Sequence, residues 1–131
     1  MSERRAVLFI EAERLIHDLV VPVLAEAGFE VEAATRAEEA LLLFRKRAAE
    51  FCAVVTDVNL GPGLTGWEIA RLIRGLAADI PVIYATGGNI HEFDAHAVPK
   101  SAVLAKPYTP DEIISVVLTL VENKTAPTEQ G

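Results

Sequence analysis

Four apolar runs of the sequence are each followed by polar residues that could act together on a phosphoryl group. Glu11 follows the first run, Asp57 and Asn59 follow the second, Thr86 follows the third and Lys106 follows the fourth. Acidic oxygens suit a hard cation such as magnesium, whereas an ammonium and a hydroxyl suit phosphoryl oxygens. The combination favours phosphoryl transfer to a carboxylate, in which a protein mainly positions groups and neutralises charge.

These polar residues need a scaffold that brings the ends of the apolar runs together. The runs are too short for helices and apolar on both faces, as is typical of buried parallel strands. They are Ala6–Ile10, Ala53–Thr56, Pro81–Ala85 and Ala102–Ala105. A more polar run, Glu30–Ala34, predicts an edge strand. In parallel α/β sheets, ligands bind at the carboxyl ends of the strands, where the polar residues stand.

Helical segments alternate with these strands. Capping boxes, in which a Thr and a Glu three residues later satisfy backbone N–H groups, predict three helix starts, at Thr35–Glu38, Thr65–Glu68 and Thr109–Glu112. A helix over about 14–27 carries Leu15, Leu19 and Val23 on one face, and a short helix is expected within 90–98. Pro22 should kink the first of these helices or displace its last turn.

Five strands alternating with five helices predict an α/β fold, a flavodoxin-like doubly wound parallel sheet of order 2-1-3-4-5. The length of 131 residues suits one domain. We place that domain at residues 1–124, with a flexible tail at 125–131 and no output domain.

The amino-acid composition limits which classes of partner the protein can bind and in which cell compartment it is expected. A net charge of -7 argues against nucleic acid or an anionic membrane as the main partner and favours a basic protein surface. Cys52 is the single cysteine, so internal disulfides are excluded. No apolar run reaches the length of a membrane span, and we expect a cytoplasmic protein.

The order and spacing of the polar residues resemble those of response-regulator receiver domains, the phosphoacceptor modules of bacterial two-component signalling. The resemblance extends from Arg5 to about Val121, and the chain is most similar to single-domain, chemotaxis-regulator-like members. It implies that Asp57, in Val-Val-Thr-Asp-Val-Asn-Leu, is the phosphoacceptor. Thr86 would be the switch hydroxyl, and Lys106 would bind phosphate and pair with the acceptor at rest. In addition, Gly66 matches the glycine that opens the third helix.

The acids after the first strand depart from the family pattern. The family usually carries two adjacent acids, the second of which binds magnesium directly, and here the pair reads Glu11 and Ala12. Glu11 matches the first acid, whose contact with the metal often passes through water, and Glu13 is one residue further along. Asn59 would supply a backbone carbonyl. The resemblance therefore implies magnesium at Glu11, Asp57 and Asn59, held weakly because a methyl group replaces a ligand.

Several functions stay open at this stage. The leading hypothesis is a phosphoacceptor, not an enzyme, that takes a phosphoryl group from a histidine kinase or histidine phosphotransfer protein and signals to a downstream protein by contact. A degenerate receiver that binds its partner without phosphorylation is the alternative, because of Ala12 and because Val103 stands where many members have a switch aromatic. Glu11 and Glu13 could also form a solvated acidic turn, and a homodimer is left open. A flavin or dinucleotide binder is disfavoured, since no Gly-x-Gly-x-x-Gly is present.

The three histidines share no metal-ligand spacing and are expected at the surface. They are His17, His91 and His96.

Overall fold

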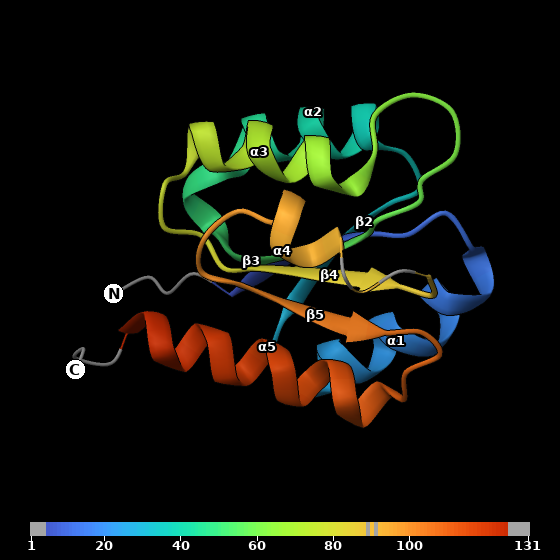
Figure 1. Ribbon diagram of the computed structural model, residues 1–131. Helices are drawn as coiled ribbons and strands as arrows, with labels where there is room; N and C mark the ends of the chain where they lie inside the picture. Colours follow the sequence, from blue (N-terminus) through green and yellow to red (C-terminus); the bar gives the residue numbers. More distant parts are fainter. Residues whose placement is uncertain (1–4, 89, 91, 126–131) are drawn as a thin grey trace.

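The computed structural model describes residues 5–88, 90 and 92–125 as three layers, a central parallel sheet covered by helices on both faces (Figure 1). The strands are β1 (Ala6–Ile10), β2 (Glu30–Ala34), β3 (Phe51–Asp57), β4 (Val82–Thr86) and β5 (Ser101–Ala105). The helices are α1 (Arg14–Glu26), α2 (Ala37–Arg47), α3 (Gly66–Leu76), α4 (Glu92–His96) and α5 (Pro110–Thr125), with a 3-10 turn at Ala48–Glu50.

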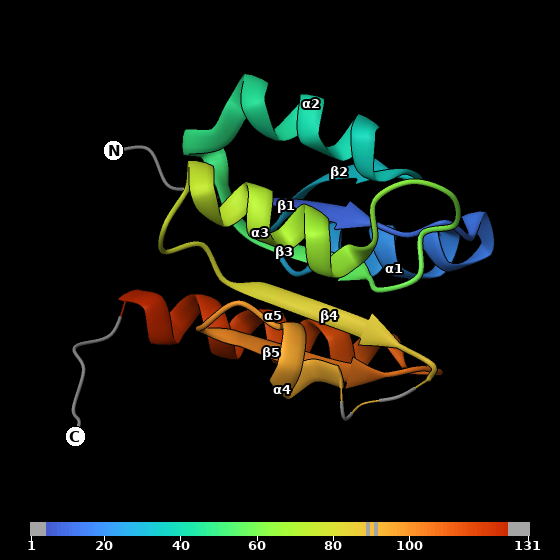
Figure 2. The ribbon, with the colours of Figure 1, turned by 45° about the horizontal axis from the view of Figure 1, so that its top comes forward.

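The sheet has the order β2-β1-β3-β4-β5 with every neighbouring pair parallel, which confirms the predicted flavodoxin-like topology. Figure 2 shows the arrowheads of β1 and β4 pointing to the same edge. The register brings the strand ends together there, since Asp57 lies opposite Ala85 and Thr86 lies opposite Ala105. The polar residues that follow these strands therefore leave the sheet at one edge.

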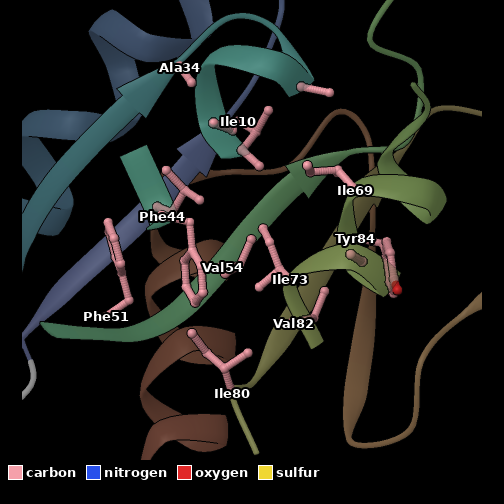
Figure 3. Close-up of a cluster of buried hydrophobic side chains, with 14 of the residues drawn as sticks. Ile10, Ala34, Phe44, Phe51, Val54, Ile69, Ile73, Ile80, Val82 and Tyr84 are labelled. Carbon is pink, nitrogen blue, oxygen red and sulfur yellow. The ribbon is translucent and has the colours of Figure 1, made fainter. Parts of the chain in front are cut away.

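Each face of the sheet has its own hydrophobic core. One face packs against α2, α3 and the α4 region, and Figure 3 shows Phe44, Phe51, Ile73 and Tyr84 among its side chains. The other face packs against α1 and α5. All seven residues of β3 are buried, because this strand is central and covered on both sides. The end of β3 is thus enclosed by structure on both faces of the sheet.

Helix α1 turns a different face to the sheet from the one that its leucines predicted. Its buried residues are His17, Val20 and Leu24, whereas Leu15 and Leu19 are 77% and 63% exposed. The expectation that His17 lies at the surface was therefore wrong. The helix carries two apolar stripes, and contact with the sheet selects the second.

The predicted capping box at Thr35 was also wrong. The chain is still extended at Arg36, the N-cap of α2, and the Thr35 N–H donates to Glu39 Oε1 at 3.1 Å. The boxes at Thr65 and Thr109 are confirmed by reciprocal hydrogen bonds with the Glu three residues later.

Several bounds differ from the predicted ones by a few residues. Strand β3 begins at Phe51 and not Ala53, and α5 continues through Thr125, the first residue of the predicted tail. Residues 126–131 and His91 lie outside the described residues. Helix α1 continues past Pro22 to Glu26. Among the described helices, none combines the length and apolar character that a membrane crossing needs.

Candidate functional site

A cleft of about 470 Å³ opens at the carboxyl ends of the central strands. Four of the five predicted site residues line it, and Glu11 does not. The lining residues are Ala12, Glu13, Asp57, Asn59, Thr86, Gly87, Gly88, Glu92 and Lys106. The tertiary structure has therefore gathered side chains from segments that are up to 94 residues apart in the chain.

Asp57 is held at the mouth of this cleft as the last residue of β3. It is only 7% exposed. Its Oδ1 accepts the Asn59 N–H at 3.2 Å, and its Oδ2 accepts from Lys106 Nζ at 3.1 Å. Since each oxygen holds one donor, the carboxylate is fixed in orientation and keeps lone pairs for a further bond.

Lys106 joins two carboxylates. Its Nζ lies 3.1 Å from Asp57 Oδ2 and 3.2 Å from Glu11 Oε1, which confirms the expected pairing with Asp57. Burial alone would lower the pKa of the ammonium, but the hydrogen bond and charge of Asp57, with those of Glu11, hold that pKa above its ordinary value. Lys106 is therefore a permanent positive charge beside the Asp57 carboxylate.

Glu11 lies beneath the cleft and not on its surface. It is 1% exposed, and its Oε2 accepts the Glu13 N–H at 3.1 Å. Burial raises the pKa of its carboxyl and the charge of Asp57 adds to this, whereas the Glu13 N–H and Lys106 oppose it. His17 Nε2 lies 2.6 Å from the Glu11 carbonyl oxygen, so α1 holds this acid from behind.

Thr86 supplies the hydroxyl on the neighbouring strand end. It is 8% exposed, and its Oγ1 accepts the Gly88 N–H at 3.1 Å. The same oxygen that faces the cleft region therefore also holds the start of the segment that leads to α4. The hydroxyl hydrogen stays available to donate to a ligand, and only a rotation of the side chain toward the ligand would break the bond to Gly88.

Comparison with known families agrees with this geometry. The family model described as "Response regulator receiver domain" matches residues 7–118. The chain belongs to this receiver domain family. Its α/β sheet, with Asp57 and Lys106 at the strand ends, is thus the receiver fold.

Similar proteins support the assignment. The chain is 29% identical to the transcriptional regulatory protein CreB of Escherichia coli, over 91% of this chain and 52% of CreB. It is 30% identical to the C4-dicarboxylate transport transcriptional regulatory protein DctD of Rhizobium meliloti, over 87% of this chain and 25% of DctD. The chain thus spans about half or less of these curated relatives.

Solved structures agree over nearly the whole of both chains. A response regulator receiver protein from Sinorhizobium medicae has a TM-score of 0.86 at 29% identity, covering 93% of this chain and 98% of that one. The chemotaxis response regulator CheY4 of Vibrio cholerae has a TM-score of 0.76 at 27% identity, covering 88% and 97%.

The residues present suit a weakly held magnesium ion better than a tightly held one. Asp57 and Asn59 line the cleft of this receiver domain, but Ala12 contributes no oxygen from its side chain and Glu11 is buried. No group of three Asp, Glu, His or Cys side chains in the described part of the chain is arranged to hold a metal. Magnesium commonly takes only one or two protein carboxylates and fills its octahedron with water, so the fit is partial.

Three features of the site escaped the sequence reasoning. Glu92 lines the cleft although it lies on α4, six residues after Thr86. His17 supports Glu11, and Tyr108 Oη is a buried polar atom without a hydrogen-bond partner in the described residues. The short distance in sequence between Thr86 and Glu92 could have suggested that Glu92 lines the cleft. The positions of His17 and Tyr108 depend on how α1 and the loop after β5 pack.

Proposed function

We propose that this receiver domain accepts a phosphoryl group on Asp57 from a phosphohistidine of a histidine kinase or histidine phosphotransfer protein. The observation that carries the proposal is the Lys106 Nζ at 3.1 Å from Asp57 Oδ2, in a cleft that Thr86 also lines. An ammonium fixed at this place neutralises charge that the phosphoryl group adds.

The reaction needs little chemistry from the protein. An Asp57 oxygen forms the new P–O bond as the P–N bond to the donor imidazole breaks, and the imidazole nitrogen keeps the electron pair of that bond and takes up a proton. Lys106 stays protonated throughout, because Asp57 and Glu11 hold its pKa high. The role of the chain is thus to orient the carboxylate and balance charge.

An apolar surface beside the cleft supports a protein as phosphodonor. Leu15 and Leu19 are exposed one turn apart on α1, and Leu19 borders a groove of about 160 Å³ with Pro107 and Tyr108. Lys106 lines both the groove and the cleft. A helical partner could pack on this surface while presenting a phosphohistidine to Asp57.

The output would run through Thr86 to a downstream protein. If the Thr86 hydroxyl turns to a phosphoryl oxygen, it releases the Gly88 N–H, and the segment leading to α4 becomes free to move. This route does not need an aromatic residue at Val103. We further propose a cytoplasmic location and a protein target, in keeping with the net charge of -7.

The direct test is intact-protein mass spectrometry after treatment with acetyl phosphate or phosphoramidate and magnesium. We expect one added phosphoryl group in the wild type and none in Asp57→Asn, which keeps the shape of the side chain but removes the nucleophile. The same added mass in Asp57→Asn would overturn the assignment of the acceptor.

We also propose that magnesium binds weakly, held by Asp57 and Asn59 with a water at Glu11. When bound, the ion supplies positive charge to the phosphoryl oxygens. Ala12→Asp restores the missing carboxylate and should tighten binding about ten- to a hundredfold. Calorimetric titration measures this, with Ala78→Asp as an exposed control. Equal affinities of wild type and Ala12→Asp would show that Ala12 is not a lost ligand.

The degenerate receiver is the second candidate, and Ala12 is the observation that favours it. It would bind its partner in the unphosphorylated state. Failure of every phosphodonor to modify the wild type at saturating magnesium, together with modification of Ala12→Asp, would establish this candidate over the first.

A further inference from the structure

The mouth of the phosphoacceptor cleft carries two carboxylates besides Asp57. Glu13 comes from the segment between β1 and α1, and Glu92 is the first residue of α4. Both residues are exposed. The side chain of Glu13 makes no capping hydrogen bond to α1, although its residue is the N-cap. The Glu13 carboxylate is therefore not tied to the backbone of α1 by a capping hydrogen bond.

The charge in the cleft is strongly unbalanced. Its lining side chains include three carboxylates and one ammonium, Lys106. That ammonium already bonds Asp57 and the buried Glu11. Among the described residues, no cation forms an ion pair with Glu13 or Glu92. An incoming phosphoryl group thus meets, beside Asp57, two negative charges that no ion pair compensates.

The negative charge of Glu13 and Glu92 repels some phosphodonors more effectively than others. A small free donor has few contacts with the protein, so repulsion at the mouth directly lowers its rate of entry. A donor protein that packs on Leu15 and Leu19 gains apolar contact area, which offsets the same repulsion. The apolar face of α1 and the acidic mouth lie on either side of Lys106, which lines both the groove and the cleft.

We propose that Glu13 and Glu92 determine phosphodonor specificity, disfavouring free anionic acyl phosphates relative to a phosphoryl group carried by a protein. The inference rests on the proposed function of Asp57. Neither glutamate takes part in the transfer itself. With acetyl phosphate, an Asp57 oxygen forms the new P–O bond, the bond from phosphorus to the acetate oxygen breaks, and acetate leaves with the electron pair.

Two small donors of different charge show whether the effect of the two glutamates depends on the charge of the donor. Phosphoramidate is smaller than acetyl phosphate and carries one negative charge fewer, because its nitrogen is protonated. That nitrogen leaves as ammonia without a further proton. The rate of Asp57 phosphorylation is measured with each donor at saturating magnesium and at low and high ionic strength. The variants are Glu13→Gln, Glu92→Gln and the double variant. The control is Glu26→Gln, an exposed acid at the far end of α1.

Each single substitution should raise the rate with acetyl phosphate about two- to threefold at low ionic strength, and the double variant about fivefold. The increase should be smaller with phosphoramidate and should vanish at high salt, because exposed charges are screened. Glu26→Gln should match the wild type with both donors.

Other outcomes would overturn the inference. Equal rates in the wild type and the double variant would mean that the two acids do not act on the donor, and would leave the proposed function intact. A rate that falls on substitution at low magnesium but matches the wild type at saturating magnesium would make Glu13 or Glu92 a metal ligand instead. If neither small donor nor a phosphohistidine-bearing phosphotransfer protein modifies any variant, the proposed function fails and the inference fails with it.

Discussion

Gly66, the first residue of α3, lies so close to the end of β3 that a side chain has no room. A Cβ placed on Gly66 would be 2.2 Å from the Asp57 carbonyl oxygen and 2.8 Å from Val58 Cα. Both are backbone atoms, so no rotamer change can relieve the contact. Gly66→Ala must therefore push α3 away from the end of β3.

The size of the effect follows from these contacts. Overpacking of this kind costs about 1–3 kcal/mol. The shift also weakens the hydrogen bond from the Gly66 N–H to the Val58 carbonyl oxygen, now 2.8 Å, at about 1 kcal/mol. The better helix propensity of alanine returns about 0.5–1 kcal/mol. We expect a net loss of about 1–3.5 kcal/mol in the free energy of unfolding.

Gly75 provides the matched control in the same helix. It is exposed, and a Cβ there would meet no atom within 4 Å. Gly75→Ala should therefore stabilise the protein by about 0.5–1 kcal/mol. Urea unfolding measures both variants, and phosphorylation of folded Gly66→Ala should be slowed because the backbone of Asp57 is displaced. Equal stability of the two variants would refute the argument from close approach.

Further predictions concern buried polar groups. Tyr108→Phe removes a buried hydroxyl without a partner and should stabilise the protein by about 1 kcal/mol at pH 7. Tyr84→Phe leaves the buried Val98 N–H without its acceptor and should cost about 1–2 kcal/mol. Chemical denaturation measures both variants, and a loss of stability in both would mean that the Tyr108 hydroxyl has a partner. Burial, with the charges of Glu11 and Asp57, raises the pKa of the Tyr108 phenol, so the folded chain keeps a proton that the unfolded chain loses above about pH 10. Stability should fall with rising pH above that value, and less steeply in Tyr108→Phe. Lys106→Met removes the ammonium that lowers the already raised pKa of the Glu11 carboxyl, which is ordinarily 4.5. A carboxyl whose pKa is higher in the folded state stabilises the fold as pH decreases, so this variant should gain stability relative to the wild type from pH 7 to pH 5. Its phosphorylation should be slower on the order of tenfold. Parallel profiles of unfolding free energy against pH in the two proteins would contradict the coupling of Lys106 to Glu11.

Local patterns were enough to predict the strands and most of the site. Buried parallel strands are apolar on both faces, so runs such as Ala6–Ile10 could be recognised as strands. Their alternation with helices favoured a doubly wound parallel sheet, for which the order 2-1-3-4-5 is a common solution. Asp57, Thr86 and Lys106 follow such runs directly, and parallel strands deliver their ends to one edge. These three residues could be located because the direction of the strands places them at one edge of the sheet.

Only the tertiary structure decided how the helices are rotated and which charges are buried. Helix α1 has two apolar stripes of similar spacing, and nothing local chooses between Leu15 and Leu19 on one side and Val20 and Leu24 on the other. Contact with the sheet chooses the second, which buries His17 against the Glu11 carbonyl and exposes the leucines beside the cleft. Burial of a side chain depends on neighbours that are distant in the sequence, so no local pattern could have reported it.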